Sequence, residues 1–182
     1  MQFAIKAILS IVALLACSFG GFYYFYTSCN NGYKGDFKET TPGGGPSSKK
    51  AIIIFQPSKD GISAGIARQI AKGMNSGGYE VTITYPGNHL PADLKDYDII
   101  AFGSPVYFGT VSSTLTEYIK KTENLSNKKI ALYSVGNLLE SNEIEILEKC
   151  LGSAKPYRKE KFIATDGASP ERAYQFGIDI LK

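Results

Sequence analysis

The sequence has few of the residues that usually carry chemistry. Its 182 residues include one histidine, three cysteines and no tryptophan. The histidine, His89, lies in a polar run, and the spacing of Cys17, Cys29 and Cys150 matches neither a metal site nor a disulfide framework. We therefore expect no metal centre, and no residue stands out as a proton-transfer catalyst.

A surplus of one charge sign is also missing from most of the chain. The formal net charge is +3, but from Ala51 onward the chain carries fifteen Lys and Arg and fifteen Asp and Glu residues. The sequence has no basic stripe with interleaved aromatic residues, which is the usual pattern of nucleic-acid binding. Nucleic acid is therefore not an expected partner.

The chain does have one long uncharged stretch near its start. Residues 7–26 carry no charge and are mostly apolar, which is about the length that a membrane-spanning helix needs. An aromatic cluster at residues 22–26 closes the stretch, as is typical of the membrane interface. We expect residues 1–26 to form a membrane anchor, and the sequence leaves the side of the membrane open.

An export signal is the competing interpretation of the same stretch. The sequence Leu14-Leu15-Ala16-Cys17 resembles a bacterial lipobox, whose cysteine is lipidated after cleavage. Against this, Lys6 alone supplies the positive charge, and the apolar run continues past the cysteine. Both interpretations place the remainder of the protein at a membrane surface.

Residues 27–50 are expected to form a linker between this stretch and the folded part. Residues 40–48 are almost entirely Thr, Pro, Gly and Ser, the composition of a flexible tether that cannot bury a core.

Predicted strands alternate with predicted helices throughout residues 51–182. The continuous apolar run at residues 51–55 is typical of a strand that is covered on both faces. Further strands are expected at residues 79–85, 98–103, 129–135 and 159–164, and helices at residues 62–75, 112–122, 140–151 and from 169 onward. This order predicts an α/β fold, a doubly wound five-stranded parallel sheet preceded by a transmembrane helix.

A sheet of this kind binds ligands outside the carboxyl ends of its strands, at the point where the strand order reverses. In the order 2-1-3-4-5, that point lies between the first and third strands. The loops that follow residues 55 and 102 are therefore the candidate site.

The first of these loops has the features of a phosphate site. The hexapeptide Ser58-Lys59-Asp60-Gly61-Ile62-Ser63 lies between a predicted strand and a predicted helix. Unpaired backbone N–H groups at a helix start point outward, and the helix dipole favours an anion there. The aspartate conflicts with this interpretation, because it places a carboxylate where the anion is expected.

The second loop offers aromatic surface beside the first. Gly103 and Gly109 permit unusual backbone dihedral angles, and Pro105 stiffens the turn between them. Tyr107 and Phe108 supply the surface on which a flat conjugated ligand stacks. The alternative is a purely structural loop whose aromatic side chains cover the end of a strand.

Together these loops make residues 51–182 resemble the flavodoxin-like family. Residues 58–63 match its pattern Ser/Thr-x-Thr-Gly-x-Thr between strand and helix, and residues 103–109 match its Gly-Ser-Pro-x-Tyr-x-Gly loop. The third loop of the family follows the fourth strand and corresponds here to Val135-Gly136-Asn137.

The resemblance implies that the ligand is flavin mononucleotide (FMN), which itself carries the electrons. It places the phosphate on the first loop, with the hydroxyl groups of Ser58 and Ser63 donating, and the isoalloxazine ring between the second and third loops, with Tyr107 stacking on it. The cofactor-binding residues that it implies are Ser58, Lys59, Asp60, Gly61, Ile62, Ser63, Ser104, Pro105, Val106, Tyr107, Phe108, Gly109, Val135, Gly136 and Asn137.

The chain departs from the family pattern in three ways. Asp60 stands in place of a threonine, Ile62 in place of a common polar residue, and the folded part is neutral where soluble flavodoxins tend to be acidic. The flavodoxin-type protoporphyrinogen oxidases have a similar Asp-Gly loop. By that resemblance the backbone N–H of residue 60 binds phosphate while its side chain turns outward, and Lys59 offsets the charge.

Three functions are left open. The first is a membrane-tethered FMN protein that passes electrons to a redox partner protein or a small-molecule acceptor. The second is a flavodoxin-like module that has lost FMN and acts in binding or scaffolding. The third is a protoporphyrinogen oxidase-like flavoenzyme; against it, only Leu138-Leu139 follows Asn137, with no long insertion for a large apolar substrate.

Overall fold

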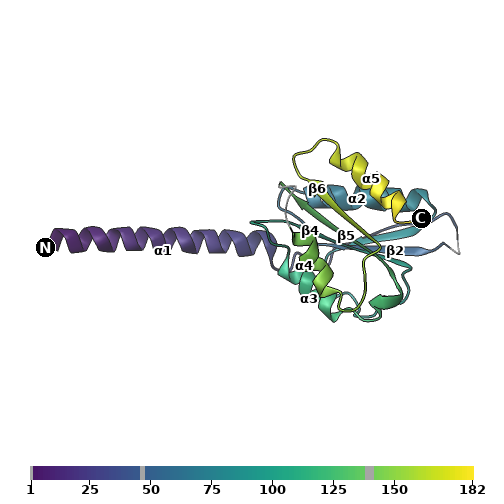
Figure 1. Cartoon of the computed structure of the whole chain (residues 1–182), viewed down its shortest axis with the longest axis horizontal. Helices are drawn as coiled ribbons and strands as arrows, with labels where there is room; N and C mark the ends of the chain where they lie inside the picture. The colour runs from purple at the N-terminus through teal and green to yellow at the C-terminus, as the bar shows by residue number, and fades with distance from the viewer. Residues whose placement is uncertain (1, 46–47, 138–141) are drawn as a thin grey trace.

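A long N-terminal helix projects from an α/β domain. The structure, a computed structural model, describes residues 2–45, 48–137 and 142–182. Helix α1 (Gln2–Asn30) extends away from the domain, with the N terminus at its far end (Figure 1). Within it, Ile5–Phe25 is long and apolar enough to cross a membrane, a property that a signal sequence shares.

Six strands form a single sheet in the order β1-β3-β2-β4-β5-β6. Five of them are parallel, and in chain order, starting from β2, these five have the predicted arrangement 2-1-3-4-5. The strands are β1 (Lys38–Thr41), β2 (Lys50–Phe55), β3 (Glu80–Thr84), β4 (Ile99–Pro105), β5 (Lys129–Gly136) and β6 (Arg158–Ile163).

The prediction of five strands is corrected by β1, which comes from the segment expected to be a linker. This strand runs antiparallel to β3, with Lys38 opposite Thr84 and Thr41 opposite Val81. All four of its residues are exposed, as is common for a short charged edge strand. The Gly- and Pro-rich residues that follow β1 mask its strand pattern in the sequence.

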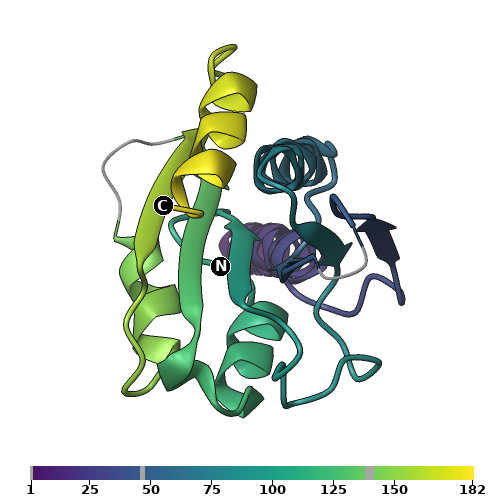
Figure 2. The same ribbon diagram turned by 90° about the vertical axis from the view of Figure 1, so that its right-hand side faces the viewer.

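The helices cover the sheet on both faces. Helices α2 (Ile62–Ser76) and α5 (Ser169–Asp179) lie together on one face, and α3 (Ser113–Lys121) and α4 (Glu143–Cys150) lie on the other (Figures 1 and 2). A short 3-10 helix, η1 (Leu125–Asn127), precedes β5. The predicted start of the fourth helix, residue 140, falls outside the described residues.

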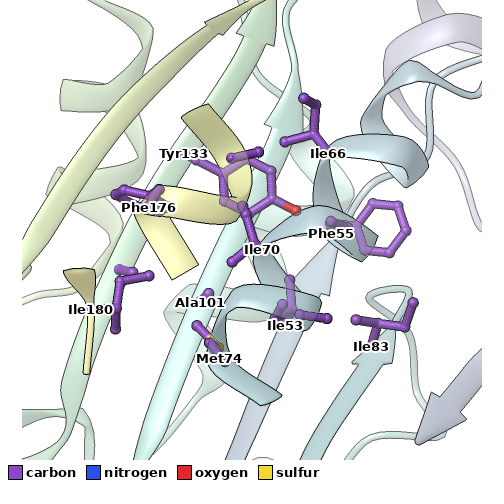
Figure 3. Close-up of a cluster of buried hydrophobic side chains, with 14 of the residues drawn as sticks. Ile53, Phe55, Ile66, Ile70, Met74, Ile83, Ala101, Tyr133, Phe176 and Ile180 are labelled. Atoms are coloured by element: carbon purple, nitrogen blue, oxygen red, sulfur yellow. The ribbon is translucent and has the colours of Figure 1, made fainter. Parts of the chain in front are cut away.

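Strand β2 supplies both hydrophobic cores, because successive side chains of a strand point to opposite faces. Ala51, Ile53 and Phe55 pack against α2 and α5, while Ile52 and Ile54 face α3 and α4. Figure 3 shows the first core, in which Ile66, Ile70 and Met74 of α2 meet Phe176 and Ile180 over the sheet. Burial on both faces explains why this strand reads as an unbroken apolar run.

Gly103 of β4 makes room for Tyr133, the largest fully buried side chain among the described residues. A Cβ atom at Gly103 would lie 1.9 Å from Cζ of Tyr133, the neighbouring residue on β5. The Tyr133 side chain is fully buried, and its hydroxyl has no hydrogen-bond partner in the described part of the chain. Burial raises the pKa of this hydroxyl. The first glycine of the second loop therefore has a packing role.

Candidate functional site

The carboxyl ends of four parallel strands meet around one cavity of about 190 Å³. Its lining comes from the loops after β2, β4, β5 and β6, so the three loops singled out in the sequence do come together. The lining residues are Ser58, Asp60, Ile62, Ser63, Pro105, Val106, Tyr107, Val135, Gly136, Asn137, Ala164 and Thr165.

The first loop is a tight turn that leads directly into α2. The backbone N–H of Gly61 donates to the carbonyl oxygen of Ser58 over 3.2 Å, and Gly61 has a φ of 76°. Glycine adopts this left-handed conformation without the strain that a side chain would add. The turn aims the start of α2 at the cavity.

The carboxylate of Asp60 turns into the loop. The resemblance to the protoporphyrinogen oxidases implies an outward side chain when the N–H of residue 60 binds phosphate, and that arrangement stays a prediction. One of its oxygens accepts a hydrogen bond of 3.0 Å from the backbone N–H of Ile62 and another from the hydroxyl of Ser58. The N–H groups and the positive dipole end of a helix start attract the nearest carboxylate. Asp60 thus occupies a donor that a phosphate at this helix start would use.

The hydroxyls predicted to bind phosphate, those of Ser58 and Ser63, lie in different surroundings. Besides donating to Asp60, the Ser58 oxygen accepts a 3.1 Å hydrogen bond from the backbone N–H of Ser63. The Ser63 hydroxyl is buried and has no hydrogen-bond partner among the residues that the structure describes. A buried polar group without a partner is rare in native proteins and calls for an explanation.

The second loop ends in a two-residue turn of the hairpin type. Tyr107 and Thr110 exchange two backbone hydrogen bonds of 3.1 Å across Phe108 and Gly109, whose φ angles are 51° and 73°. Positive φ at both central residues is the signature of a type I′ turn. This conformation is unfavourable for phenylalanine, and the turn presents the Phe108 ring on the surface, 60% exposed.

Ser104 is a predicted site residue that does not line the cavity and whose hydroxyl is engaged within its own loop. Its hydroxyl is buried, donates to the carbonyl oxygen of Pro105 over 2.8 Å and accepts from the backbone N–H of Ser112 over 2.9 Å. These bonds fix the loop between β4 and α3. Lys59 and Gly61 likewise do not line the cavity, whereas Phe108 and Gly109 line the adjoining one.

The third loop closes the cavity from the side of β5. The backbone N–H of Val106 donates to the carbonyl oxygen of Val135 over 2.8 Å, which holds the second and third loops together. A Cβ atom at Gly136 would lie 3.0 Å from Cβ of Val106. Leu138 and Leu139, on which the expectation of a missing insertion depends, lie outside the described residues.

A second cavity, of about 330 Å³, adjoins the first and shares Val106, Tyr107 and Asn137 with it. Two of its lining residues, Phe25 of α1 and Lys161 of β6, are not among those predicted from the sequence. No pattern in the sequence shows that α1 reaches this site.

Two further residues of the first cavity, Ala164 and Thr165, were also missed. They directly follow β6, and the general rule that loops after parallel strands share one edge could have found them.

One lining residue of the second cavity, Lys161, belongs to an ion pair. The side chain of Glu143, at the start of α4, is fully buried, and it pairs with the ammonium group of Lys161, whose side chain is 12% exposed. The hydroxyl of Ser134 lies 3.3 Å from the same carboxylate. Lys161 thus brings a cationic donor to a wall that also includes the aromatic residues Phe25, Tyr107 and Phe108.

The single histidine of the chain lies away from both cavities. His89 contacts Asp36 at 3.0 Å and Thr84 at 3.2 Å, and it does not line either cavity. Within residues 2–45, 48–137 and 142–182, no group of three or more His, Cys, Asp or Glu residues is placed to hold a metal ion.

Comparisons with known proteins agree with this architecture. A solved structure of oxidised Flavodoxin 2 from Bacillus cereus is 23% identical, with a TM-score of 0.59 over 72% of this chain and 97% of that one. The flavodoxin of Megasphaera elsdenii in its two-electron reduced form is 13% identical, with a TM-score of 0.60 over 71% of this chain and 97% of that one. At these identities the likeness shows the fold.

Among curated proteins, the chain is similar to an NAD(P)H dehydrogenase (quinone) of Archaeoglobus fulgidus. The two are 30% identical over 120 residues, which cover 52% of this chain and 62% of that relative. A family model described as a flavodoxin domain matches residues 52–176. The resemblance drawn from the three loops is thereby confirmed: the chain belongs to the flavodoxin domain family.

Proposed function

We propose that this protein binds FMN at the carboxyl edge of its sheet and serves in electron transfer or oxidoreduction while α1 tethers it to a membrane. The observation that carries the proposal is the convergence of the three predicted loops on one cavity. It is lined by Ser63, whose buried hydroxyl has no hydrogen-bond partner among the described residues. The family typically binds FMN, and the named relative from A. fulgidus has a redox activity in its name.

The first loop can accept a phosphate group if the Asp60 carboxylate moves away from the backbone N–H of Ile62. The Ser63 hydroxyl is available to donate to a phosphate oxygen, and the N–H groups at the start of α2 form the usual anion site of such a fold. Asp60 competes for the N–H of Ile62. A bound phosphate therefore has to displace this carboxylate, which predicts weaker binding than a threonine at the same position would allow.

The ring half of the site fits a flat conjugated group. Cavities of about 190 and 330 Å³ share three residues, and together they reach the size range of cofactor pockets, roughly 300–1,000 Å³. Tyr107 lines both, which supports its proposed role as the stacking aromatic residue. When bound, the flavin supplies the redox chemistry, and the protein positions it and sets the polarity around it.

The membrane tether rests on α1. Its residues Ile5–Phe25 are exposed along the whole length and meet the length and composition of a membrane span. The same helix is consistent with a signal sequence, including lipidation of Cys17. Retention of residues 1–16 in the mature protein, read from the intact mass of membrane-extracted material, separates an anchor from a cleaved signal.

A flavodoxin-like module without FMN is the second candidate, and the inward turn of Asp60 favours it. The first loop satisfies its own Ile62 donor with a protein carboxylate, as a loop that no longer binds phosphate would.

The protoporphyrinogen oxidase-like activity remains a third proposal, supported by the Asp-Gly loop and tested by oxidation of protoporphyrinogen with the flavin-loaded protein.

The visible absorption spectrum of the purified full chain tests the first proposal. At neutral pH, we expect the protein to show the visible absorption bands of a bound flavin, either as purified or after FMN is added and the excess removed. A colourless protein that takes up no FMN would exclude the first proposal and leave the flavin-free module.

A further inference from the structure

The end of α1 is fixed to the second loop by a polar network. Asn30 is fully buried, and its side-chain amide donates to the backbone oxygens of Thr110 and Val111 over 3.1 and 3.2 Å. The next residue, Asn31, accepts a 3.0 Å hydrogen bond from the backbone N–H of Ser113 at the start of α3. A helix held by buried hydrogen bonds at its last residue has a defined direction relative to the domain.

Two aromatic residues one to two helical turns before Asn30 contact both predicted ligand loops. The ring centroids of Phe22 and Phe108 lie 4.7 Å apart, and the Lys59 ammonium lies 5.0 Å from the centroid of the Phe25 ring. Residues three apart share one face of a helix. This face of α1 therefore bridges the loop predicted to hold phosphate and the loop predicted to hold the ring.

The Phe25 side chain also lines the second cavity, together with Asn137 and Lys161. That cavity includes Tyr107 and adjoins the one that contains Ser63, so it is where the ring of a flavin would lie if its phosphate bound at the first loop. An aromatic side chain at this position offers the kind of surface on which a conjugated ring packs.

We propose that the end of α1 is a wall of the flavin site, with Phe25 as a ring-contacting residue, so that the flavin lies at the membrane surface and its redox partner reaches it from the bilayer. This inference rests on the FMN binding proposed above. It makes the membrane helix a part of the site and not only a tether.

The position of the span defines the kind of partner. The apolar stretch Ile5–Phe25 ends at the residue that lines the cavity, which places the cavity at the level of the bilayer surface. Helix α1 and the lipid around it cover this side of the site against a soluble globular protein. A small redox compound dissolved in the bilayer, entering beside the aromatic residues of α1, is the partner that this geometry fits.

The first test compares two phenylalanine substitutions in α1, each in the full chain in lipid nanodiscs. Phe25→Ala removes the proposed wall, whereas Phe19→Ala removes a ring that is 71% exposed on the same helix. Dissociation constants for FMN and for riboflavin are measured by calorimetry. We expect Phe25→Ala to weaken both ligands by about tenfold, because both carry the ring, and Phe19→Ala to leave both unchanged.

The pattern of the four affinities separates the possible failures. Equal affinities in Phe25→Ala and Phe19→Ala would overturn the wall. A loss confined to FMN would also overturn it, because Phe25 would then act on the phosphate through Lys59. If the unsubstituted chain binds no flavin, both the proposed function and the proposed role of Phe25 are refuted. The first two results would refute only the role of Phe25, because the unsubstituted chain would still bind FMN.

The second test locates the ring relative to the lipid. The full chain in nanodiscs is loaded with 8-fluoro-FMN, and its fluorine NMR line is recorded with lipids spin-labelled near the headgroup and, separately, with a soluble gadolinium chelate. We expect the labelled lipid to broaden the line. Broadening by the soluble chelate alone would place the ring away from the bilayer and contradict the proposed route of the partner.

Discussion

The Asp60 carboxylate and the backbone N–H of Ile62, the first residue of α2, are joined by a hydrogen bond of 3.0 Å. In this arrangement an acidic side chain occupies the helix start at which the family pattern places a hydroxyl beside a phosphate. Whether the chain is a working flavoprotein therefore depends on how readily this carboxylate gives way to a phosphate.

Substitution of Asp60 is expected to strengthen the binding of FMN. Asp60→Asn keeps an oxygen that can accept from Ile62 and removes the charge that repels a phosphate, so we expect about a tenfold lower dissociation constant for FMN. Riboflavin, which has no phosphate, should bind the unsubstituted protein and the Asp60→Asn variant with equal affinity. Asp96→Asn, which neutralises an exposed carboxylate outside both cavities, is the matched control and should change neither affinity.

Loss of the Lys161 charge is expected to destabilise the domain. Glu143 is fully buried, and Lys161→Met leaves its carboxylate without the cation that pairs with it. Removing one partner of a buried pair typically costs about 3–5 kcal/mol. The free energy of unfolding of the full chain in detergent, from urea titration, measures the loss.

The double variant Lys161→Met/Glu143→Gln provides the control, because it removes both charges. It should recover most of the lost stability. If the single and double variants are equally unstable, the ion pair is not the cause of the effect.

The packing of Gly103 against Tyr133 predicts opposite effects for two substitutions. Gly103→Ala forces a methyl group into the Tyr133 ring and should lower the free energy of unfolding by about 1–3 kcal/mol. Tyr133→Phe removes a buried hydroxyl that has no partner among the described residues, and should raise the free energy of unfolding by about 1 kcal/mol.

Gly65→Ala in α2 is the matched control for Gly103→Ala. Apart from its chain neighbours and the backbone of its own helix, no described atom lies within 4 Å of the added methyl group. Alanine favours the helix over glycine by about 1 kcal/mol, so this variant should be slightly stabilised. A stabilised Gly103→Ala variant would contradict the packing described here.

Cys150 is expected to resist alkylation in the folded protein. Burial raises the pKa of its thiol, and the thiolate is the reactive form, so the fraction that can react at pH 8 is lowered. Iodoacetamide should modify Cys150 slowly in the folded protein and quickly once urea unfolds the domain, read from the mass of the peptide that contains Cys150. Equal rates in the folded and unfolded protein would show that the Cys150 thiol is accessible.

The sequence predicts most of the sheet because burial leaves a clear pattern. Strand β2 is covered on both faces, and its unbroken apolar residues are found without a structure, as are the loops that follow β2, β4 and β5. Strand β1 is not found, since a short exposed edge of Lys, Glu and Thr has no apolar periodicity and adjoins a Gly-rich stretch.

The site itself is only partly predictable, because contacts between distant segments leave no local trace. Ser63 and Tyr107 follow from the loop patterns, and the structure brings them to one cavity; their role in binding FMN stays a prediction. Ser104 fits the same pattern, yet its hydroxyl is engaged within its own loop. The approach of Phe25 depends on the direction of α1, which the buried side chain of Asn30 sets and which no nearby pattern in the sequence reveals.

Calorimetric titration of the full chain with FMN, compared with riboflavin under the same conditions, tests the central claim most directly. Hydrogen bonds to a charged phosphate are worth about 1.5–3 kcal/mol each, so we expect one FMN to bind per chain and to bind at least about tenfold more tightly than riboflavin. Failure to bind either flavin, or equal affinity for the two, would contradict a phosphate site at the start of α2.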